Sequence, residues 1–439
     1  MNSNKKILLA FYGDDFTGST DALEFICRAG ARALLFIEPP TAEQLSAYPD
    51  LDVFGVAGMT RSLPPAEMEN ILLPAFEKMK ATGAAQVHYK TCSTFDSSAA
   101  IGSIGKAIDC GARVFNNKLI LVLGGTPALG RYCLFGNLFA RMGIGSIGDI
   151  YRLDRHPSMR KHPVTPAMES DLRLHIGQQT DKKIGLINVL QLDQVIENWT
   201  AHLKDEEVVL IDALDNEHLQ KIGYWMNAQV NGSGTLFSVG PSAIEMALGS
   251  YWEGAGIFNK KNQWVTPAKA MPLLVISGSC SPVTAAQIVY AKANGFKEVI
   301  IDAAKIYSDD LEEETSKIIA LLQQQENVVV HTGEKKANNL PAEKLGTALG
   351  MLAKEAAKKS LIKRVVIAGG DTSSYAARAM EIEAVEIIAP LVAGAPLCKA
   401  ISKNKHINGL EVNFKGGQVG SEDYFEVLLN GKLTVTVAR

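Results

Sequence analysis

The sequence predicts an α/β protein with two domains, each built on a mostly parallel sheet flanked by helices. Short β-rich runs alternate with helical patterns along the whole chain, which is the rhythm of parallel sheets. The length of 439 residues exceeds what one hydrophobic core usually organises. A change of composition at residues 251–272, where Gly, Lys, Asn and Trp interrupt the apolar pattern, separates two such series. We therefore expect an N-terminal domain at residues 1–262 and a C-terminal domain at residues 263–439.

The first series of strands carries the N-terminal domain. The apolar runs are at residues 7–12, 32–37, 53–58, 85–90, 119–125, 183–189, 206–213 and 234–240. Between them lie segments of helical or loop character. Residues 149–180 are rich in proline, arginine and lysine, and they predict a loop with a short helix in its second half. A long basic loop in a compact domain is typical of a functional or mobile segment.

The second series begins at residue 273. Its strand patterns are at residues 273–277, 298–303, 327–333 and 364–368, followed by a last stretch at 409–429. No repeat or low-complexity tract interrupts either series, so the sequence predicts two globular domains rather than an array.

Composition excludes several classes of function. Apolar residues make up 47% and charged residues 21% of the chain, as in ordinary globular proteins. The net charge of −3 gives no electrostatic case for nucleic acid. No segment approaches the length of a transmembrane span, and the apolar run near the N-terminus is too short for a signal peptide, so we expect neither membrane insertion nor export. The six cysteines form no C-x-x-C pair and the eight histidines are dispersed, which predicts a reducing cytoplasm and no metal ligand set within the protein.

Two adjacent carboxylates follow the first strand. Asp14 and Asp15 come after Gly13, and Thr17 and Gly18 then open a predicted helix. Ligands of open α/β sheets bind at the carboxyl ends of the strands, so these side chains are candidates for a binding site. The alternative is that one aspartate only caps the helix.

Two cations follow neighbouring strands of the same series. Arg61 lies in the loop MTRSLPP and Lys90 ends the run at residues 85–90. A cation pairs with a carboxylate, while aspartates accept hydrogen bonds from hydroxyls, so the set suits a small acid that also carries hydroxyls. A solvated salt bridge is the simpler alternative.

The C-terminal domain has strand ends rich in Gly, Ser and Thr. The clearest is VVIAGGDTSSYAARAM, in which a buried strand leads through two glycines into a helix, a geometry that suits phosphate. It is neither a Walker A loop nor a G-x-G-x-x-G loop. Two further stretches, VISGSCSPVT and NFKGGQVG, add serines and glycines at other strand ends. The candidate phosphate-binding residues are Ser279, Gly369, Gly370, Asp371, Thr372, Gly416 and Gly417.

Taken together, the motifs resemble the four-carbon acid sugar kinase family. The resemblance rests on GDDFTGSTD, MTRSLPP, GSCSPVT, GGDT and KGGQVGSEDYF, in this order over nearly the whole chain. It implies an ATP-dependent kinase that phosphorylates acids such as threonate, erythronate or 3-oxo-tetronate. The sugar acid would bind to the N-terminal domain and ATP with Mg²⁺ to the C-terminal domain, with the active site in the cleft between them. The oligomeric state stays open, with a homodimer as one option.

The resemblance also assigns roles to single residues. The substrate side would comprise Asp14, Asp15, Thr17, Gly18, Arg61 and Lys90, and the nucleotide side the seven candidate phosphate-binding residues. Asp15 or Asp14 would accept the proton of the attacking hydroxyl, and Asp371 would orient Mg²⁺ or act as the base itself. The sequence does not choose between these aspartates.

One segment departs from the family pattern. Relatives usually continue after the lysine and one spacer residue with Asp-Ser-Thr-Leu-Arg-Gly, whereas this chain places Cys92 where the Asp is expected and Asp96 where the Arg is expected. An aspartate there accepts hydrogen bonds from hydroxyls instead of pairing with a carboxylate. The segment therefore predicts a branched or five-carbon substrate such as 3-oxo-isoapionate. The alternative is that Arg155 or Arg160 supplies the missing cation.

Two other classes of function remain for comparison. A dinucleotide oxidoreductase should carry the glycine fingerprint followed by an acidic residue, and the sequence lacks that unit. A non-catalytic sensor of sugar acids would keep Arg61 and Lys90 but would have no need for a phosphate loop. Nucleotide binding distinguishes the sensor from the kinase.

Overall fold

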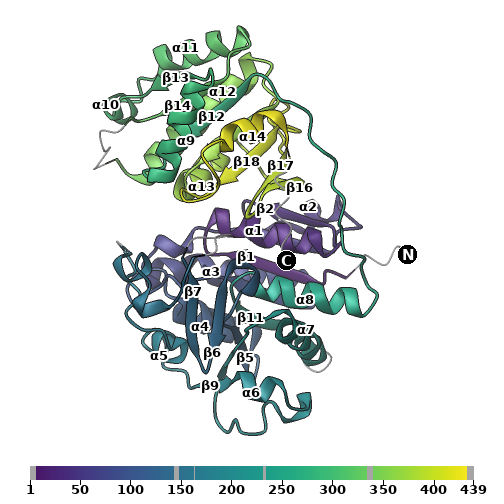
Figure 1. The fold of residues 1–439 in the computed structure, drawn as a ribbon. Helices are drawn as coiled ribbons and strands as arrows, with labels where there is room; N and C mark the ends of the chain where they lie inside the picture. Colours follow the sequence, from purple (N-terminus) through teal and green to yellow (C-terminus); the bar gives the residue numbers. More distant parts are fainter. Residues whose placement is uncertain (1–5, 143–147, 163, 231–233, 334–339, 433–439) are drawn as a thin grey trace. The chain divides into compact units, whose positions relative to one another are not determined.

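A computed structural model describes residues 6–142, 148–162, 164–230, 234–333 and 340–432 (Figure 1). Residues 1–5, which belong to the segment tested above for an export signal, lie outside the described residues. The chain divides into two compact units. The first unit comprises residues 1–14, 25–33 and 39–261, and the second comprises residues 15–24, 34–38 and 262–439.

The first unit contains a parallel sheet with the strand order β3-β1-β4-β11-β5-β10-β9. The bounds are β1 Leu9–Gly13, β3 Val53–Ala57, β4 Gln86–Lys90, β5 Ile120–Leu123, β9 Ile184–Ile187, β10 Val208–Ile211 and β11 Leu236–Gly240. Every residue of the central strands β1, β4 and β11 is buried. These strands therefore read as apolar runs without alternation, as expected for a parallel sheet covered on both faces.

Helices cover both faces of this sheet. Their bounds are α2 Ala42–Ser46, α3 Pro65–Ala81, α4 Ile104–Phe115, α5 Leu172–Gly177, α6 Val189–Leu192, α7 Asn216–Val230 and α8 Ala243–Gly254. Phe237 of β11 stacks on Phe115 of α4, with ring centroids 5.0 Å apart. The next residues along β4 and β11 face the opposite way, where His88 meets Glu245 of α8. Thus α3 and α4 pack together on one face and α7 and α8 on the other.

A small antiparallel sheet follows β5. It has the order β6-β7-β8, with bounds β6 Arg131–Leu134, β7 Asn137–Arg141 and β8 Ile150–Arg152. Residues 149–180, expected as a loop with one short helix, contain β8 and two short 3₁₀ turns as well as α5. The segment is thus partly a strand of this small sheet.

The second unit contains the strand order β13-β14-β12-β15-β18-β17-β16-β2. Its bounds are β2 Ala33–Phe36, β12 Leu273–Ser277, β13 Lys297–Ile300, β14 Val328–His331, β15 Arg364–Ala368, β16 Ala384–Val392, β17 Ala395–Ile401 and β18 Glu411–Lys415. The first five strands of this order are parallel, whereas β16 pairs antiparallel with both β17 and β2, and β17 pairs antiparallel with β18. The parallel strands β12, β15 and β18 therefore end at one common edge.

Helices also flank the sheet of the second unit, as the green and yellow ribbon in Figure 1 shows for α9 to α14. Their bounds are α1 Phe16–Arg28, α9 Pro282–Ala293, α10 Ala303–Tyr307, α11 Glu312–Gln323, α12 Ala342–Lys359, α13 Gly370–Ala379 and α14 Tyr424–Asn430. Helices α12 and α13 pack together, and α9 and α14 pack around a buried cluster that includes Val275, Val366 and Tyr424. Phe16, at the start of α1, lies against Phe414 of β18 with ring centroids 4.3 Å apart.

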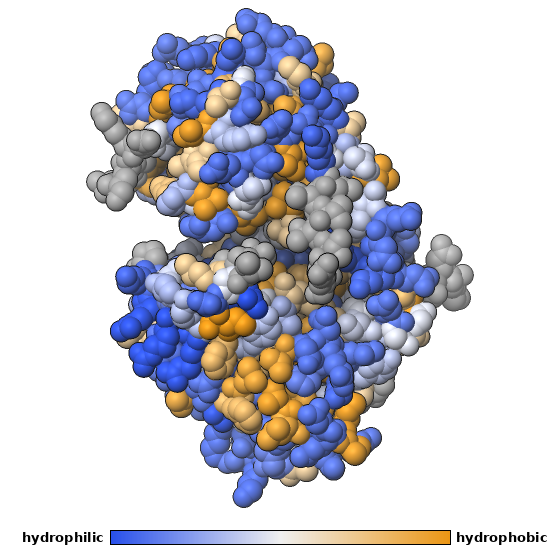
Figure 2. Space-filling model, viewed as in Figure 1, coloured by the Kyte–Doolittle hydropathy of each residue, from blue (hydrophilic) through white to orange (hydrophobic). Residues whose placement is uncertain are grey.

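The predicted fold class is confirmed, because both units have mostly parallel sheets flanked by helices. All six cysteines lie in the described part and carry free thiols. No described helix is long and apolar enough to cross a lipid bilayer. Hydrophilic residues occupy most of the face seen in Figure 2, with apolar residues interspersed.

Candidate functional site

Asp14 lies at the carboxyl end of β1, inside a charged pair. The Arg61 guanidinium donates from Nη2 to Oδ1 at 2.7 Å and from Nε to Oδ2 at 3.2 Å. The Cys92 amide donates to the same Oδ2 at 3.2 Å. Only 3% of Asp14 is exposed. The Asp14 amide donates to the Lys90 carbonyl at 2.9 Å, so the structure brings Asp14, Arg61 and Lys90 together at the ends of the neighbouring strands β3, β1 and β4.

The loop after β4 adds further polar groups beside this pair. The Thr94 hydroxyl donates to Asp96 Oδ1 at 2.8 Å and lies 3.1 Å from Cys92 Sγ. Burial, reinforced by the charge of Asp96, raises the pKa of the Cys92 thiol to about 11. Cys92 is therefore a neutral thiol at physiological pH and not a nucleophile.

Helix α5 anchors this loop from the other side. Phe95 has a φ of 53°, a conformation that non-glycine residues rarely adopt, and its ring is buried. His175 Nε2 of α5 lies 2.8 Å from Ser97 Oγ and 3.2 Å from the Phe95 carbonyl, and Gln179 donates to Ser97 Oγ at 3.0 Å. Burial lowers the pKa of His175, so the ring is neutral. Sequence reasoning missed these anchors because His175 and Gln179 are some 80 residues away from the loop they hold.

Asp15 has different partners from Asp14. Its Oδ1 accepts the Gly18 amide at 2.7 Å and its Oδ2 accepts the Thr17 hydroxyl at 3.0 Å. This is the geometry of an N-cap residue for α1, so the capping alternative describes a real interaction of Asp15. A Cβ placed on Gly416 would lie 3.8 Å from Thr17 Oγ1. Asp15, Thr17 and Gly18 therefore lie in the second unit, beside the glycine loop that follows β18.

The predicted phosphate-binding residues converge within the second unit. Three loops meet where β12, β15 and β18 end: Gly278–Ser281, Gly369–Thr372 and Gly416–Gly417. A Cβ on Gly417 would lie 2.9 Å from Ser279 Oγ, and one on Gly278 would lie 2.3 Å from Thr372 Oγ1. Gly369 has a φ of 126° and would bring a Cβ 3.4 Å from the Ser279 amide. Close packing of the loops thus explains why these positions are glycine.

Gly370 is different, because a Cβ there would meet no protein atom within 4 Å and its φ is not positive. It is the first residue of α13, and the exposed Asp371 follows it in the first turn. The helix start offers amide donors and the positive end of the helix dipole. Packing within the protein does not account for this glycine, whereas close approach of a ligand would.

Sequence reasoning missed Lys415, the residue directly before the last glycine loop. It is completely buried, and its ammonium lies 2.9 Å from Thr284 Oγ1 of α9. Burial lowers the pKa of Lys415 to about 8. The signal available in the sequence was a lysine directly after Phe414 at the end of a predicted strand, immediately before two glycines.

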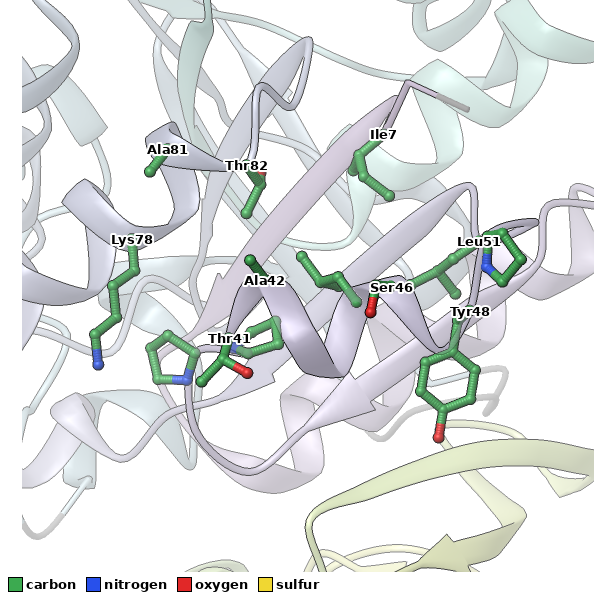
Figure 3. A pocket seen from close by; sticks show the side chains of 13 residues that line it. Ile7, Thr41, Ala42, Ser46, Tyr48, Leu51, Lys78, Ala81 and Thr82 are labelled. Atoms are coloured by element: carbon green, nitrogen blue, oxygen red, sulfur yellow. The ribbon is translucent and has the colours of Figure 1, made fainter. Parts of the chain in front are cut away.

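A pocket of about 390 Å³ lies elsewhere in the first unit (Figure 3). Ile7 and Leu51, which line it, come just before β1 and β3, so the pocket lies at the opposite sheet edge from Asp14. In Figure 3 the side chains of Lys78 and Tyr48 lie at its two ends. It contains none of the predicted site residues.

Comparison with known proteins matches two successive parts of the chain. Residues 9–248 match the model of a sugar-binding N-terminal domain, and residues 274–425 match that of a nucleotide-binding C-terminal domain. The chain is 38% identical to a 3-oxo-isoapionate kinase of Paraburkholderia graminis over 97% of this chain and 95% of the relative. It is 27% identical to a 3-oxo-tetronate kinase of Pseudomonas fluorescens, over 97% of each chain.

Solved structures share the fold. A Salmonella typhimurium protein has a TM-score of 0.78 and 24% identity, over 97% of this chain and 99% of that one. A Haemophilus influenzae protein has a TM-score of 0.70 and 24% identity, over 95% of this chain and 98% of that one. The resemblance and the enzyme class drawn from the motifs are confirmed, and the sensor alternative is set aside. The chain belongs to the two-domain family of sugar-acid kinases, with a sugar-binding N-terminal and a nucleotide-binding C-terminal domain.

Proposed function

We propose that this kinase transfers the γ-phosphate of ATP to a hydroxyl of 3-oxo-isoapionate or a closely related branched sugar acid. The observation that carries the proposal is the 38% identity to a 3-oxo-isoapionate kinase, against 27% to a 3-oxo-tetronate kinase. The loop with Cys92, Thr94 and Asp96 supports the same choice. A carboxylate and a hydroxyl in this loop accept and donate hydrogen bonds to a polyhydroxy ligand.

The nucleotide would bind to the domain at residues 263–439. The three convergent loops supply backbone amides, serine and threonine hydroxyls and the start of α13, which together suit the phosphates of ATP. Among the described residues no group of three or more His, Cys, Asp or Glu suits a metal ion. Mg²⁺ fits nevertheless, because it is usually held by one or two carboxylates and the substrate phosphates, and Asp371 is exposed beside the loops. When bound with ATP, Mg²⁺ neutralises charge on the β- and γ-phosphates.

The sugar acid would bind to the domain at residues 1–262. Arg61 already forms a bidentate pair with Asp14. We therefore assign the substrate carboxylate to Lys90 together with Arg61, and we assign to Asp14 the positioning of the guanidinium. Asp96 and Thr94 would contact the additional hydroxyls, while the neutral Cys92 would border the ligand without reacting.

Asp15 is the proposed general base. Phosphoryl transfer demands little covalent chemistry from the protein beyond positioning the reactants and accepting one proton. An opposite charge next to a carboxylate favours its ionised form, so a carboxylate held in a guanidinium fork accepts a proton less readily. Asp14 lies in such a fork with Arg61, and the donors to Asp15 include the Thr17 hydroxyl and the Gly18 amide. The hydroxyl proton would move to Asp15, the hydroxyl oxygen would bond to the γ-phosphorus, and ADP would leave.

A substrate panel tests the proposal. ADP release should be measured with 3-oxo-isoapionate, 3-oxo-tetronate, threonate and erythronate at equal concentrations of ATP and Mg²⁺. We expect the highest kcat/KM with 3-oxo-isoapionate and a phosphorylated product in the mass spectrum. A higher kcat/KM with threonate or erythronate would overturn the substrate assignment, and ADP release independent of every acid would overturn the reaction.

A further inference from the structure

Lys415 is a buried cation without a carboxylate partner. It ends β18 and is completely buried, and in the described part of the chain no ion pair includes it. At the other end of the same two strands, the buried Arg364 of β15 pairs with Glu411 of β18 at 2.5 Å. Buried charges are normally paired, because an unpaired one is costly. The charge of Arg364 at one end of the strands is thus neutralised, whereas no described residue neutralises that of Lys415 at the other end. A negatively charged ligand near Lys415 would compensate its charge.

The ammonium of Lys415 instead contacts uncharged carbonyl oxygens of the loop that follows it. Its Nζ donates to the Gly416 carbonyl at 3.1 Å and lies 3.5 Å from the Gly417 carbonyl. Thr284 of α9 accepts a hydrogen bond from the same ammonium and donates its own to the Gly417 carbonyl at 2.9 Å. Both carbonyls are therefore turned toward the interior of the second unit.

Helix α9 also binds the carbonyls further along this loop. The side-chain amide of Gln287 donates to the carbonyls of Val419 at 3.0 Å and Ser421 at 2.9 Å, and lies 3.2 Å from that of Gly420. Lys415, Thr284 and Gln287 thus contact the carbonyl oxygens of residues 416, 417 and 419–421.

The orientation of these carbonyls fixes the orientation of the amides. In a planar trans peptide the C=O and the next N–H point in opposite directions. Since the Gly416 and Gly417 carbonyls face Lys415, the amides of Gly417 and Gln418 face away from it. Neither amide donates to a protein acceptor among the described residues. Successive amides that point the same way form an anion-binding concavity.

We infer that Lys415 is a positioning residue for nucleotide phosphates: its buried ammonium holds the loop after β18 with the amides of Gly417 and Gln418 outward and supplies a positive charge that the protein does not neutralise. The phosphates of ATP are the compensating partner. This inference rests on the proposed nucleotide site and adds to it a residue that contacts the phosphates through the loop rather than directly.

The titration of Lys415 follows from its surroundings. The ring of Tyr424 on α14 lies 5.4 Å from its ammonium, α9 contributes the uncharged Thr284, and the loop contributes carbonyls. Burial alone lowers the pKa of Lys415 to about 8, and burial raises the pKa of Tyr424 well above its ordinary value, so the phenol stays neutral. Polyphosphate bound nearby stabilises the ammonium and raises the pKa of Lys415. Between about pH 8 and 9, binding of ATP should therefore take up a proton.

The full-length Lys415→Met variant tests the inference, with Lys354→Met on α12 as a control that makes the same substitution at a partly exposed lysine. Removing a buried charge that has no counter-ion should leave the melting temperature equal or higher. We expect the Kd for ATP, measured by calorimetry at pH 7, to rise at least tenfold in Lys415→Met and to stay within twofold in Lys354→Met. A purely structural lysine predicts a lower melting temperature and an unchanged Kd, which would overturn the inference.

Proton uptake on ATP binding tests the inference even if Lys415→Met also has a lower melting temperature. Binding of ATP to the wild type at pH 8.5 is measured in buffers of different ionisation enthalpy. We expect uptake of a fraction of one proton in the wild type and in Lys354→Met, and none in Lys415→Met. Uptake that persists in Lys415→Met overturns the inference, as does no uptake in the wild type. If the wild type does not bind ATP at all, the nucleotide assignment fails instead.

Discussion

Asp14 and Asp15 are adjacent in the sequence and make different contacts with an arginine and with a helix start. Asp14 pairs with Arg61, and Asp15 caps α1. The sequence indicated that both lie at a strand end, because a glycine and two acids follow an apolar run. It did not indicate the pairing with Arg61, since the two residues are 47 positions apart and several acids were available to that arginine.

Substitution of Asp15 separates its two roles. Asn caps a helix about as well as Asp, so Asp15→Asn should keep the hydrogen bond to Gly18 and leave the melting temperature nearly unchanged. It should nevertheless lose most of kcat, because an amide does not accept the hydroxyl proton. Asp15→Ala should lose kcat and, in addition, about 1 kcal/mol of the free energy of unfolding. Thermal melts and steady-state kinetics on both variants check this, and a normal kcat in Asp15→Asn would leave Asp15 as a cap only.

Asp96 should set the choice among sugar acids. Asp96→Asn removes the charge but keeps an oxygen to accept from Thr94, so the loop should keep its conformation. Loss of one charged hydrogen bond is worth roughly 1.5–3 kcal/mol, which is about ten- to a hundredfold in kcat/KM. We expect that loss with 3-oxo-isoapionate and a smaller one with 3-oxo-tetronate. Equal losses with both acids would remove Asp96 from the specificity determinants, and the alternative that Arg155 or Arg160 acts there would then be tested by Arg→Met variants.

At the scale of elements, the parallel strands and β2 were predicted well, whereas the strands of the hairpins β6–β7 and β16–β17 were not. Most parallel strands are short buried apolar runs, which the sequence displays directly, although β13 is largely exposed and β18 contains Glu411 and Asn413. The hairpin β16–β17 contains Pro390 and Pro396, which argue against strands in a sequence, and the pairing between its strands shifts register between Ile387 and Val392. The turn of β6–β7 uses Phe135 and Gly136 at positive φ, where Asn-Gly is the usual signal.

The loops of the nucleotide domain were predicted as a set because they share one physical cause. Strands β12, β15 and β18 are parallel neighbours, so their ends meet, and glycines there permit close approach. Lys415 was not selected, because burial of a lysine and the inward direction of carbonyls are properties of the folded chain. The sequence letters KGG are equally compatible with an exposed turn.

The start of α13 offers a direct test of ligand approach. Gly370→Ala adds a methyl group that meets no protein atom within 4 Å, so the fold should gain up to about 1 kcal/mol from better helix propensity. If a phosphate approaches the Gly370 backbone closely, the same methyl should raise the Kd for ATP severalfold. Gly177→Ala at the end of α5, also in open space, is the matched control and should leave that Kd unchanged. Unchanged affinity in Gly370→Ala would remove this position from the phosphate site.

At the scale of the whole molecule, the second unit is not a continuous stretch of sequence. Besides residues 262–439 it contains residues 15–24 and 34–38. Phe16 packs on Phe414, β2 pairs with β16, and Glu24 accepts the Gly394 amide at 3.1 Å. The cytoplasmic location and the homodimer stay predictions.

A fragment of residues 262–439 should therefore be less stable than the same residues in the full chain. Losing the burial of Phe16 alone is worth about 1.5–3 kcal/mol, and β16 would have an unpaired edge. Fusing residues 15–38 ahead of the fragment through a flexible linker should recover part of the melting temperature and of the affinity for ATP. The measurement is thermal melting with and without ATP. A fragment that melts and binds ATP like the full chain would show that the two segments contribute nothing.

Because the second unit is built from separate stretches of the sequence, recombination between two members of this family can divide it. A single crossover near residue 262 joins the helix start and the β2 strand of one parent to the sheet and glycine loops of another. In such a hybrid the two sides of the Phe16–Phe414 and β2–β16 contacts come from different parents. A chimaera that is to keep one parent's nucleotide site must therefore also contain that parent's residues 15–38. Two separate segments of the gene have to come from the same parent.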